Sequence, residues 1–234
     1  MSPKEIVLYG LIMLFALMLS FSVHEFMHAF VADWLGDKTP RNMGRLTLNP
    51  LAHMDPVGTI LLLAAGFGWG KPVMYNPARL NRFKSSRLMN IMVHLAGVTG
   101  NFIVALISAV IATLVSCISQ GRVEPESTAA IAVSTVIMAF TYTEQFSLML
   151  LAFNLLPIPP LDGFHVLEEL LPYKLKRTEG YRKFQMFSPY GIWVLFIFSY
   201  FSNIDILDWV ITIIRWPFAY VIYLVCNLIS MPFG

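Results

Sequence analysis

The sequence is poor in charge and in cysteine. Only 13% of its 234 residues are Asp, Glu, Lys or Arg, about half the share in an average soluble domain, and the formal net charge is +2. This small basic excess predicts no nucleic-acid partner. Cys117 and Cys226 both lie in apolar runs, without the spacing of a disulfide framework or a zinc motif, so we interpret them as packing residues. Internal repeats and low-complexity tracts are also missing.

Apolar residues dominate the composition. They make up 57% of the chain, and the mean hydropathy is +0.66. This composition predicts an all-α polytopic membrane protein with a single membrane-embedded domain over residues 1–234. The catalytic core is expected over about residues 6–172 and the C-terminal membrane segments over about 184–231. About five membrane segments are expected, at residues 6–35, 88–119, 129–153, 190–201 and 207–229.

The first apolar run contains the motif His24-Glu25-Phe26-Met27-His28, an H-E-x-x-H sequence. Residues four apart lie on one face of a helix, so His24 and His28 can bind one metal ion. Glu25 beside them can act as the catalytic acid and base on a water that the metal activates. The run continues without a break into this motif, so we expect an uncleaved membrane span and not a signal peptide.

A catalytic zinc ion takes three protein ligands, so the histidine pair needs a third. Asp162 is the candidate, because it follows a segment that Pro157, Pro159 and Pro160 prevent from being helical, and because a carboxylate at membrane depth needs a cation. One alternative is that Asp162 only caps the helix expected over residues 164–171. Another is a membrane zinc protease that cuts at the cytosolic face, with Glu168 or Glu169 as the third ligand.

Other polar residues are candidates for supporting roles. Asn101 or Asn154 could donate a hydrogen bond to the oxyanion or position the substrate, and the sequence does not rank the two. His165 follows Asp162 by three residues and could support the metal ligands. His53 could approach the metal or the substrate, although a structural hydrogen bond is the simpler interpretation, and a buried structural role is also expected for His94.

The stretch between the first two spans predicts a short re-entrant or hairpin region. Residues 58–66 are apolar but too few to cross a membrane, and the glycines after them break any helix. A substrate helix hides its peptide bonds in hydrogen bonds and must unwind before hydrolysis. We therefore expect an extended edge over residues 71–77, which could capture the unwound segment by strand addition.

Basic residues alternate between the connecting loops. The loops after the first and third spans hold eight and five Lys or Arg residues, whereas the N-terminal tail and the loop after the second span hold one each. The positive-inside rule then predicts an external N-terminus, two cytoplasmic basic loops and a cytoplasmic C-terminus if the last segment spans. The histidine pair and Asp162 both fall toward the cytoplasmic ends of their spans.

These motifs resemble the site-2 protease family of intramembrane zinc metalloproteases, in its short bacterial branch. The resemblance covers about residues 20–170. It is carried by the H-E-x-x-H motif, by the pattern Asn154-x-x-Pro157-x-x-x-x-Asp162-Gly163, and by residues 48–59 and 68–73. Many members have Ala-Gly-Pro where this chain has Ala96-Gly97-Val98, and no PDZ or CBS domain is inserted.

The resemblance implies zinc bound by His24, His28 and Asp162, one ion per chain, with Glu25 as the catalytic residue. It implies cleavage of membrane-anchored proteins within their transmembrane segments, near the cytoplasmic face of a bacterial cell membrane. A metal transporter, a catalytically silent metal-binding membrane protein and, more weakly, a di-iron oxidase are the alternatives. The intact Glu25 and the single close pair of histidines argue against them. The substrate and the oligomeric state are not readable.

Overall fold

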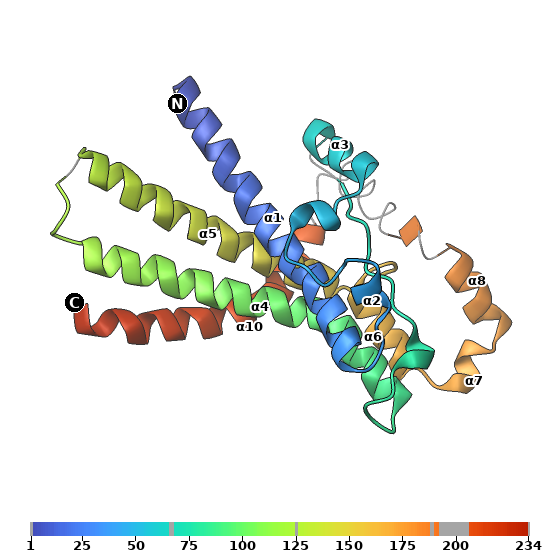
Figure 1. Cartoon of the computed structure of the whole chain (residues 1–234). Coiled ribbons are helices and arrows are strands. Elements are labelled where there is room, and N and C mark those ends of the chain that lie inside the picture. The colour runs from blue at the N-terminus through green and yellow to red at the C-terminus, as the bar shows by residue number, and fades with distance from the viewer. Residues whose placement is uncertain (1, 66–67, 125, 188–189, 192–205, 234) are drawn as a thin grey trace.

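A computed structural model describes residues 2–65, 68–124, 126–187, 190–191 and 206–233. Within these ranges the fold is helical, with four long helices and several short ones (Figure 1). The long helices are α1 (Pro3–Trp34), α4 (Ser86–Ser119), α5 (Thr128–Asn154) and α10 (Ile206–Ser230). The short ones are α2 (Thr39–Asn42), α3 (Pro56–Ala65), α6 (Asp162–Leu170), α7 (Tyr173–Lys176), α8 (Glu179–Phe187) and the 3-10 turns η1 (Pro50–Ala52), η2 (Pro77–Arg79) and η4 (Met231–Phe233).

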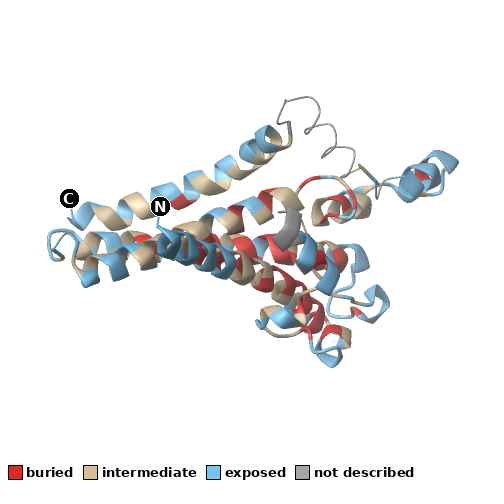
Figure 2. Ribbon diagram, turned by 90° about the horizontal axis from the view of Figure 1, so that it is seen from above, coloured by how far each residue is buried: buried red, intermediate tan, exposed pale blue. Residues whose placement is uncertain are grey.

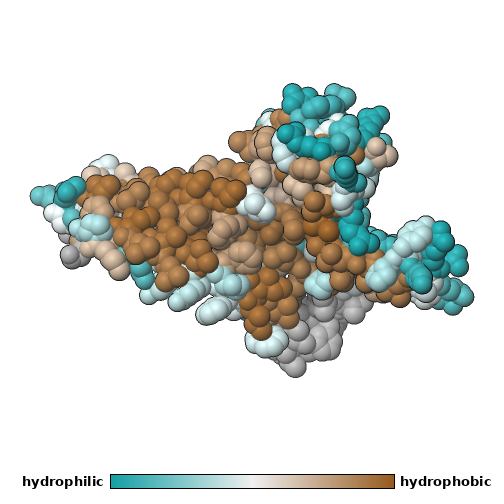
Figure 3. All heavy atoms as spheres, turned by 90° about the horizontal axis from the view of Figure 1, so that it is seen from below, coloured by the Kyte–Doolittle hydropathy of each residue, from teal (hydrophilic) through white to brown (hydrophobic). Residues whose placement is uncertain are grey.

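The four long helices are long and apolar enough to cross a membrane. Figure 3 shows a continuous apolar surface along the body of the molecule, with hydrophilic residues gathered mainly at one end. Such an apolar band fits a lipid environment and not water. The chain is therefore a multi-pass membrane protein with an all-α fold. The expected span at 190–201 falls almost entirely outside the described residues, so the structure describes four of the five expected segments.

Helices α1, α4 and α5 form the core of the bundle. Their facing sides carry small residues, among them Ala16, Ala105 and Ala109, which are all buried. Small side chains let membrane helices approach closely, where van der Waals packing and hydrogen bonds hold them. The hydroxyls of Ser20 on α1 and Ser147 on α5 are 2.8 Å apart and supply one such bond. The buried residues gather where α1, α4, α5 and α6 meet (Figure 2).

Helix α10 packs against α4 and α5 and corrects the expected position of the C-terminus. Near its beginning, Ile211 and Ile214 contact the cluster around Leu151. Near its end, Ser230 lines a cavity with Ser116 at the end of α4. The helix thus runs from the end of the bundle that holds the histidine pair to the opposite end, and Figure 2 shows the N-terminus toward that same side. The prediction that the two termini lie on opposite sides is wrong, because the apolar face of α10 packs along α4 and α5 in this direction.

The region between α1 and α4 folds back over the end of the bundle. Met54 and Gly70 form an antiparallel bridge, and the N–H of Lys71 donates to the carbonyl of His53 at 2.8 Å. Helix α3 fills the loop that this bridge closes. The expected hairpin is therefore a single bridge around a short helix, and residues 71–76 are extended without belonging to a strand in the part of the chain described.

The proline-rich segment after α5 positions the third candidate ligand. The N-cap of α6 is Leu161, and Asp162 is its first helical residue and makes no capping bond. A Cβ at Gly163 would collide with the backbone carbonyl of Leu155, so glycine lets the start of α6 lie against the end of α5. The alternative in which Asp162 acts only as a helix cap does not hold in this geometry.

Candidate metal centre and active site

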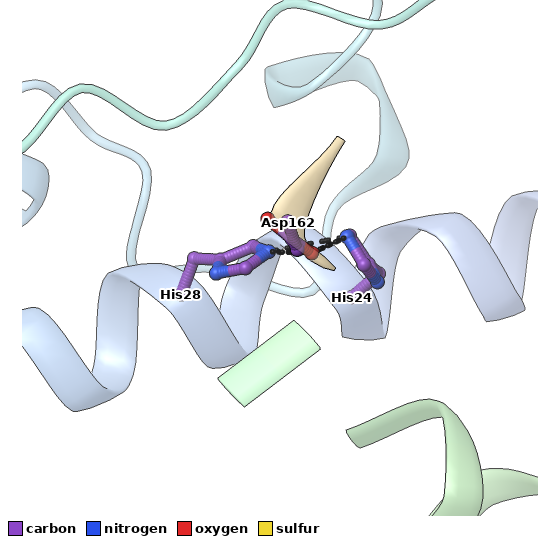
Figure 4. Close-up of side chains that lie close together, drawn as sticks. All are labelled: His24, His28 and Asp162. Carbon is purple, nitrogen blue, oxygen red and sulfur yellow. Dashed lines mark hydrogen bonds and ion pairs between the residues drawn. The ribbon is translucent and has the colours of Figure 1, made fainter. Parts of the chain in front are cut away.

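Three potential metal ligands converge where α1 meets the start of α6. The Nε2 atoms of His24 and His28 are 3.1 Å apart, and the Oδ2 atom of Asp162 lies 3.3 Å from the first and 3.2 Å from the second (Figure 4). Two ligands of a tetrahedral zinc ion at about 2.0–2.2 Å from the metal are separated by roughly 3.3 Å. The three observed spacings therefore match three corners of such a site.

The hydrogen bonds behind the imidazoles determine which ring nitrogen faces the site. Nδ1 of His28 lies 2.8 Å from the carbonyl oxygen of Val93, so it carries the proton that it donates, and Nε2 keeps its lone pair. Nδ1 of His24 lies 3.3 Å from the side-chain amide of Asn101, whose Oδ1 is buried and has no hydrogen-bond partner. Rotating the Asn101 amide by about 180° exchanges its oxygen and nitrogen. Oδ1 then accepts a hydrogen bond from the Nδ1–H of His24, and both groups have a partner.

This arrangement fits a bound metal ion. With both Nδ1 atoms protonated, two imidazole lone pairs point at one carboxylate oxygen, and Oδ2 of Asp162 is buried with no hydrogen-bond donor. Three electron-pair donors facing one point are the arrangement that a metal cation binds.

Glycine at position 97 makes room for the two imidazoles. A Cβ at Gly97 would collide with Nε2 of His28 and with the ring of His24. Helix α4 therefore presents bare backbone to the ligands, and Asn101, one turn further along, reaches His24 from the same face. Gly97 belongs to the Ala96-Gly97-Val98 segment noted in the sequence.

Glu25 shares the cavity with the three ligands. This cavity has a volume of about 210 Å³, and Pro72, Val73 and Tyr75 form one of its walls. Glu25 is nearly buried, and its Oε2 accepts a hydrogen bond of 3.2 Å from the N–H of Val73. The extended segment after the bridge thus holds the carboxylate in place beside the ligands.

The other predicted residues divide into those inside and those outside this cavity. Asn154 and His165 line it, whereas Asn101 and His53 do not. Asn101 is fully buried behind His24, and its side-chain amide lies 3.3 Å from Nδ1 of that ring. His53 is also fully buried, and its Nε2 lies 2.9 Å from the carbonyl oxygen of Thr47, as a structural role requires.

The rival third ligands are engaged elsewhere. Glu168 accepts hydrogen bonds from Tyr181 and Gln185, both at 2.7 Å, and Glu169 accepts one from Asn90 at 2.9 Å. Neither belongs to the group of potential ligands formed by the two histidines and Asp162, which is the one group of its kind among the residues that the structure describes.

Tyr75 and His94 are members of the site for which the sequence carried little signal. The Tyr75 hydroxyl lies 3.0 Å from Nε2 of His94, and the ring of His94 stacks on that of His165 with centroids 4.9 Å apart. Burial, followed by the charges of Glu169 and Asp162, raises the pKa of Tyr75 to about 12, so its hydroxyl stays neutral. No motif contains Tyr75, and only the folding of residues 71–76 over the bundle brings it here.

Taken together, a helical membrane bundle with a His-His-Asp site and an adjacent glutamate defines the class of membrane-embedded metallohydrolases. Residues 12–198 match the model of peptidase family M50. The chain therefore belongs to this family, the site-2 protease family, and is a metalloprotease.

Two relatives agree with this assignment. Over 169 residues the chain is 40% identical to "Putative zinc metalloprotease YwhC" of Bacillus subtilis, an alignment that covers 70% of this chain and 73% of that one. Over 168 residues it is 33% identical to "Putative zinc metalloprotease Rip2" of Mycolicibacterium smegmatis, covering 69% of this chain and 58% of that one. No solved structure matches the chain significantly.

Proposed function

We propose that this protein is an intramembrane zinc endopeptidase that hydrolyses peptide bonds in the transmembrane segments of membrane-anchored proteins. The observation that carries the proposal is the convergence of two Nε2 atoms and one carboxylate oxygen within 3.1–3.3 Å, at one end of a bundle of membrane-spanning helices. His24, His28 and Asp162 hold one zinc ion per chain, and Glu25 is the catalytic acid and base.

Each residue has a defined task in this proposal. When bound, zinc lowers the pKa of water and polarises the scissile carbonyl. Glu25 takes a proton from the attacking water and passes it to the nitrogen of the leaving amine. The N–H of Val73 keeps the Glu25 carboxylate turned toward the ligands, which shortens the path of that proton. Val93 and Asn101 hold the two imidazoles in the tautomer that ligation needs.

Two side chains in the cavity can donate to the oxyanion. Asn154 uses one of its two amide hydrogens on the carbonyl of Leu150, at 2.9 Å, and keeps the other. The Tyr75 hydroxyl is the second donor, with His94 as its hydrogen-bond partner. Asn101 lies behind His24, so we assign it to positioning that ring and not to the oxyanion.

The extended residues 71–76 are proposed to hold the substrate in an extended conformation by strand addition. Met74→Pro removes one backbone N–H from this edge and should reduce cleavage without loss of zinc. This variant is cleaner than Val73→Pro, which would also release Glu25. Cleavage by Met74→Pro at the wild-type rate, in a protein that melts normally, would exclude strand addition at this position.

We place the protein in a bacterial cell membrane, with its N-terminus outside and the site toward the cytoplasmic side. The basic loops on either side of the site support this orientation. The partners are then the lipid bilayer and a transmembrane protein substrate.

A paired measurement tests the proposal. Zinc content by elemental analysis and cleavage of a model transmembrane substrate in detergent are measured for wild type, Glu25→Gln and Glu144→Gln. Glu144 is a second carboxyl group inside a span but outside the cavity, so its variant is a matched control. We expect about one zinc ion in all three proteins and cleavage in all but Glu25→Gln. Equal cleavage by Glu25→Gln, or transport of zinc without any cleavage, would contradict the proposal.

The ligand set has its own test. Asp162→Ala should lose zinc, whereas Glu168→Ala should keep it. The reverse result would favour the alternative in which a glutamate of α6 is the third ligand.

A further inference from the structure

A second cavity, distinct from the catalytic one, lies next to it on the side of the membrane interior. It has a volume of about 160 Å³, and its walls are almost entirely apolar. Its walls come from α1 (Phe21), from α5 (Leu150), from the segment that leads into the active site (Gly70), and from Met54 together with the start of α3.

Three walls of this apolar pocket continue into walls of the catalytic cavity. On α1, Phe21 precedes Glu25 by four residues, and on α5, Leu150 precedes Asn154 by four residues. Four residues of α-helix advance about 6 Å. Both helices run toward the end that holds the site, so both place the pocket about one helical turn deeper in the membrane than the catalytic residues.

The third wall gives the same offset. Gly70 lines the apolar pocket, and Pro72, two residues later in the extended segment, lines the catalytic cavity. Two residues of extended chain advance about 6.6 Å. A Cβ at Gly70 would collide with the ring of Phe21, so glycine lets this ring lie against the backbone of the segment.

We infer that this apolar pocket binds a leucine- or phenylalanine-sized side chain of the substrate, two residues deeper in the membrane than the scissile bond. The inference rests on the proposed function. A substrate segment must be extended at the cut, and in an extended chain residues i and i+2 point to the same side, about 6.6 Å apart. A residue at the catalytic cavity therefore places its second neighbour at the pocket.

Size and chemistry agree with this occupant. An apolar cavity of about 150 Å³ holds one benzene molecule, so the pocket accepts a branched aliphatic side chain or one aromatic ring. Because it lies on the membrane side, it selects a residue that transmembrane segments commonly supply. For a substrate whose N-terminus is cytoplasmic, that residue is the second one after the cut, and for the opposite orientation it is the second one before the cut.

The test is a substrate series in which this position is Ala, Leu, Phe or Trp, with the cut mapped by mass spectrometry. For the wild-type protein we expect kcat/KM to be roughly ten-fold or more higher for Leu or Phe than for Ala, because small differences in filling an apolar pocket change rates by this order. The same changes one position away should have a much smaller effect, since that side chain points to the other side.

Two pocket variants change the preferred size of the substrate side chain in opposite directions. Leu150→Trp fills the pocket and should bring the ratio of Leu to Ala substrates close to one. Phe21→Ala enlarges it and should make the Trp substrate the better one. Matched controls on lipid-facing positions of the same helices are Met149→Trp and Phe15→Ala, whose side chains are exposed and which should keep the wild-type ranking.

The outcomes separate this inference from the proposed function. If the wild-type protein cleaves in a Glu25-dependent manner but does not distinguish the four substrates at this position, the pocket holds something else, such as a lipid acyl chain, and the inference is wrong while the proposed function stands. If both pocket variants rank the four substrates as the wild type does, the inference is likewise wrong and the proposed function stands. Absence of Glu25-dependent cleavage would instead refute the proposed function, and the inference with it.

Discussion

Replacing Gly97 with alanine should damage the metal centre without unfolding the bundle. The new Cβ would lie 2.7 Å from Nδ1 of His24 and still closer to Nε2 of His28, whereas ordinary contacts begin at 3.4 Å. The Cε1 atom of the same His24 ring would lie at 2.5 Å, so the ring would have to move by about 0.9 Å. Metal–ligand distances tolerate only about ±0.2 Å, so this movement cannot be absorbed within the site.

Two effects set the size of the damage: weaker metal binding and a slower reaction. Disturbing the groups that orient a metal ligand typically costs 10- to 100-fold in affinity, and a misplacement of about 1 Å can cost roughly 10²-fold in rate. We expect Gly97→Ala to bind zinc at least ten-fold more weakly, measured by competition with a chelator. Its cleavage rate should remain well below that of wild type even at saturating zinc.

Gly10→Ala, which also adds a methyl group to a membrane helix, is the matched control. A Cβ at Gly10 would meet no other atom within 4 Å. This variant should bind zinc as the wild type does. If Gly97→Ala bound zinc with wild-type affinity and cleaved at the wild-type rate, the described packing of α4 against the two imidazoles would be wrong.

Three further predictions follow from individual contacts. Asn101→Leu should weaken zinc binding by roughly 10- to 100-fold, since the Nδ1–H of His24 loses its acceptor. Tyr75→Phe removes one oxyanion donor and should lower kcat by roughly 10²-fold with little change in KM or zinc content. For Asp37, burial would raise the pKa of the carboxyl, but hydrogen bonds from two backbone N–H groups and a threonine hydroxyl lower it overall. A lowered folded-state pKa means that this stabilisation is complete above the unfolded value of about 3.9 and is lost as the pH falls further. Wild type should therefore lose more thermal stability between pH 7 and pH 3 than Asp37→Asn does.

Each of these three predictions has a control variant or an outcome that would contradict it. Tyr181→Phe also removes a buried tyrosine hydroxyl, but one that donates to Glu168 outside the catalytic cavity, so its kcat should stay near the wild-type value. For Asn101, restoration by Asn101→Asp, which keeps the acceptor, would support positioning of His24, and failure of both variants to bind less zinc would contradict it. Equal acid sensitivity of wild type and Asp37→Asn would show that the carboxylate contributes nothing to stability.

Much of this protein could be predicted from local patterns. Spacing on one helix places His24 and His28 on the same face whatever surrounds them, because the α-helical repeat is a property of the backbone. Apolar composition over lengths of 27 to 34 residues likewise predicts the membrane helices α1, α4 and α5. The break before Asp162 follows from the prolines, which cannot continue a helix.

The roles of the asparagines and of the segment after Gly70 could not be predicted in this way. Asn101 and Asn154 are equivalent as residue types, and only the packing of α4 and α5 against α1 places the first behind His24 and the second in the cavity. Tyr75 reaches the site because residues 71–76 fold over the end of the bundle. The apolar pocket exists only where three distant parts of the chain meet, and the direction of α10 depends on which neighbours bury its apolar face. Helical periodicity and hydropathy act over a few residues along the chain, whereas cavities and hydrogen bonds between helices arise from contacts between distant residues, which only the tertiary fold brings together.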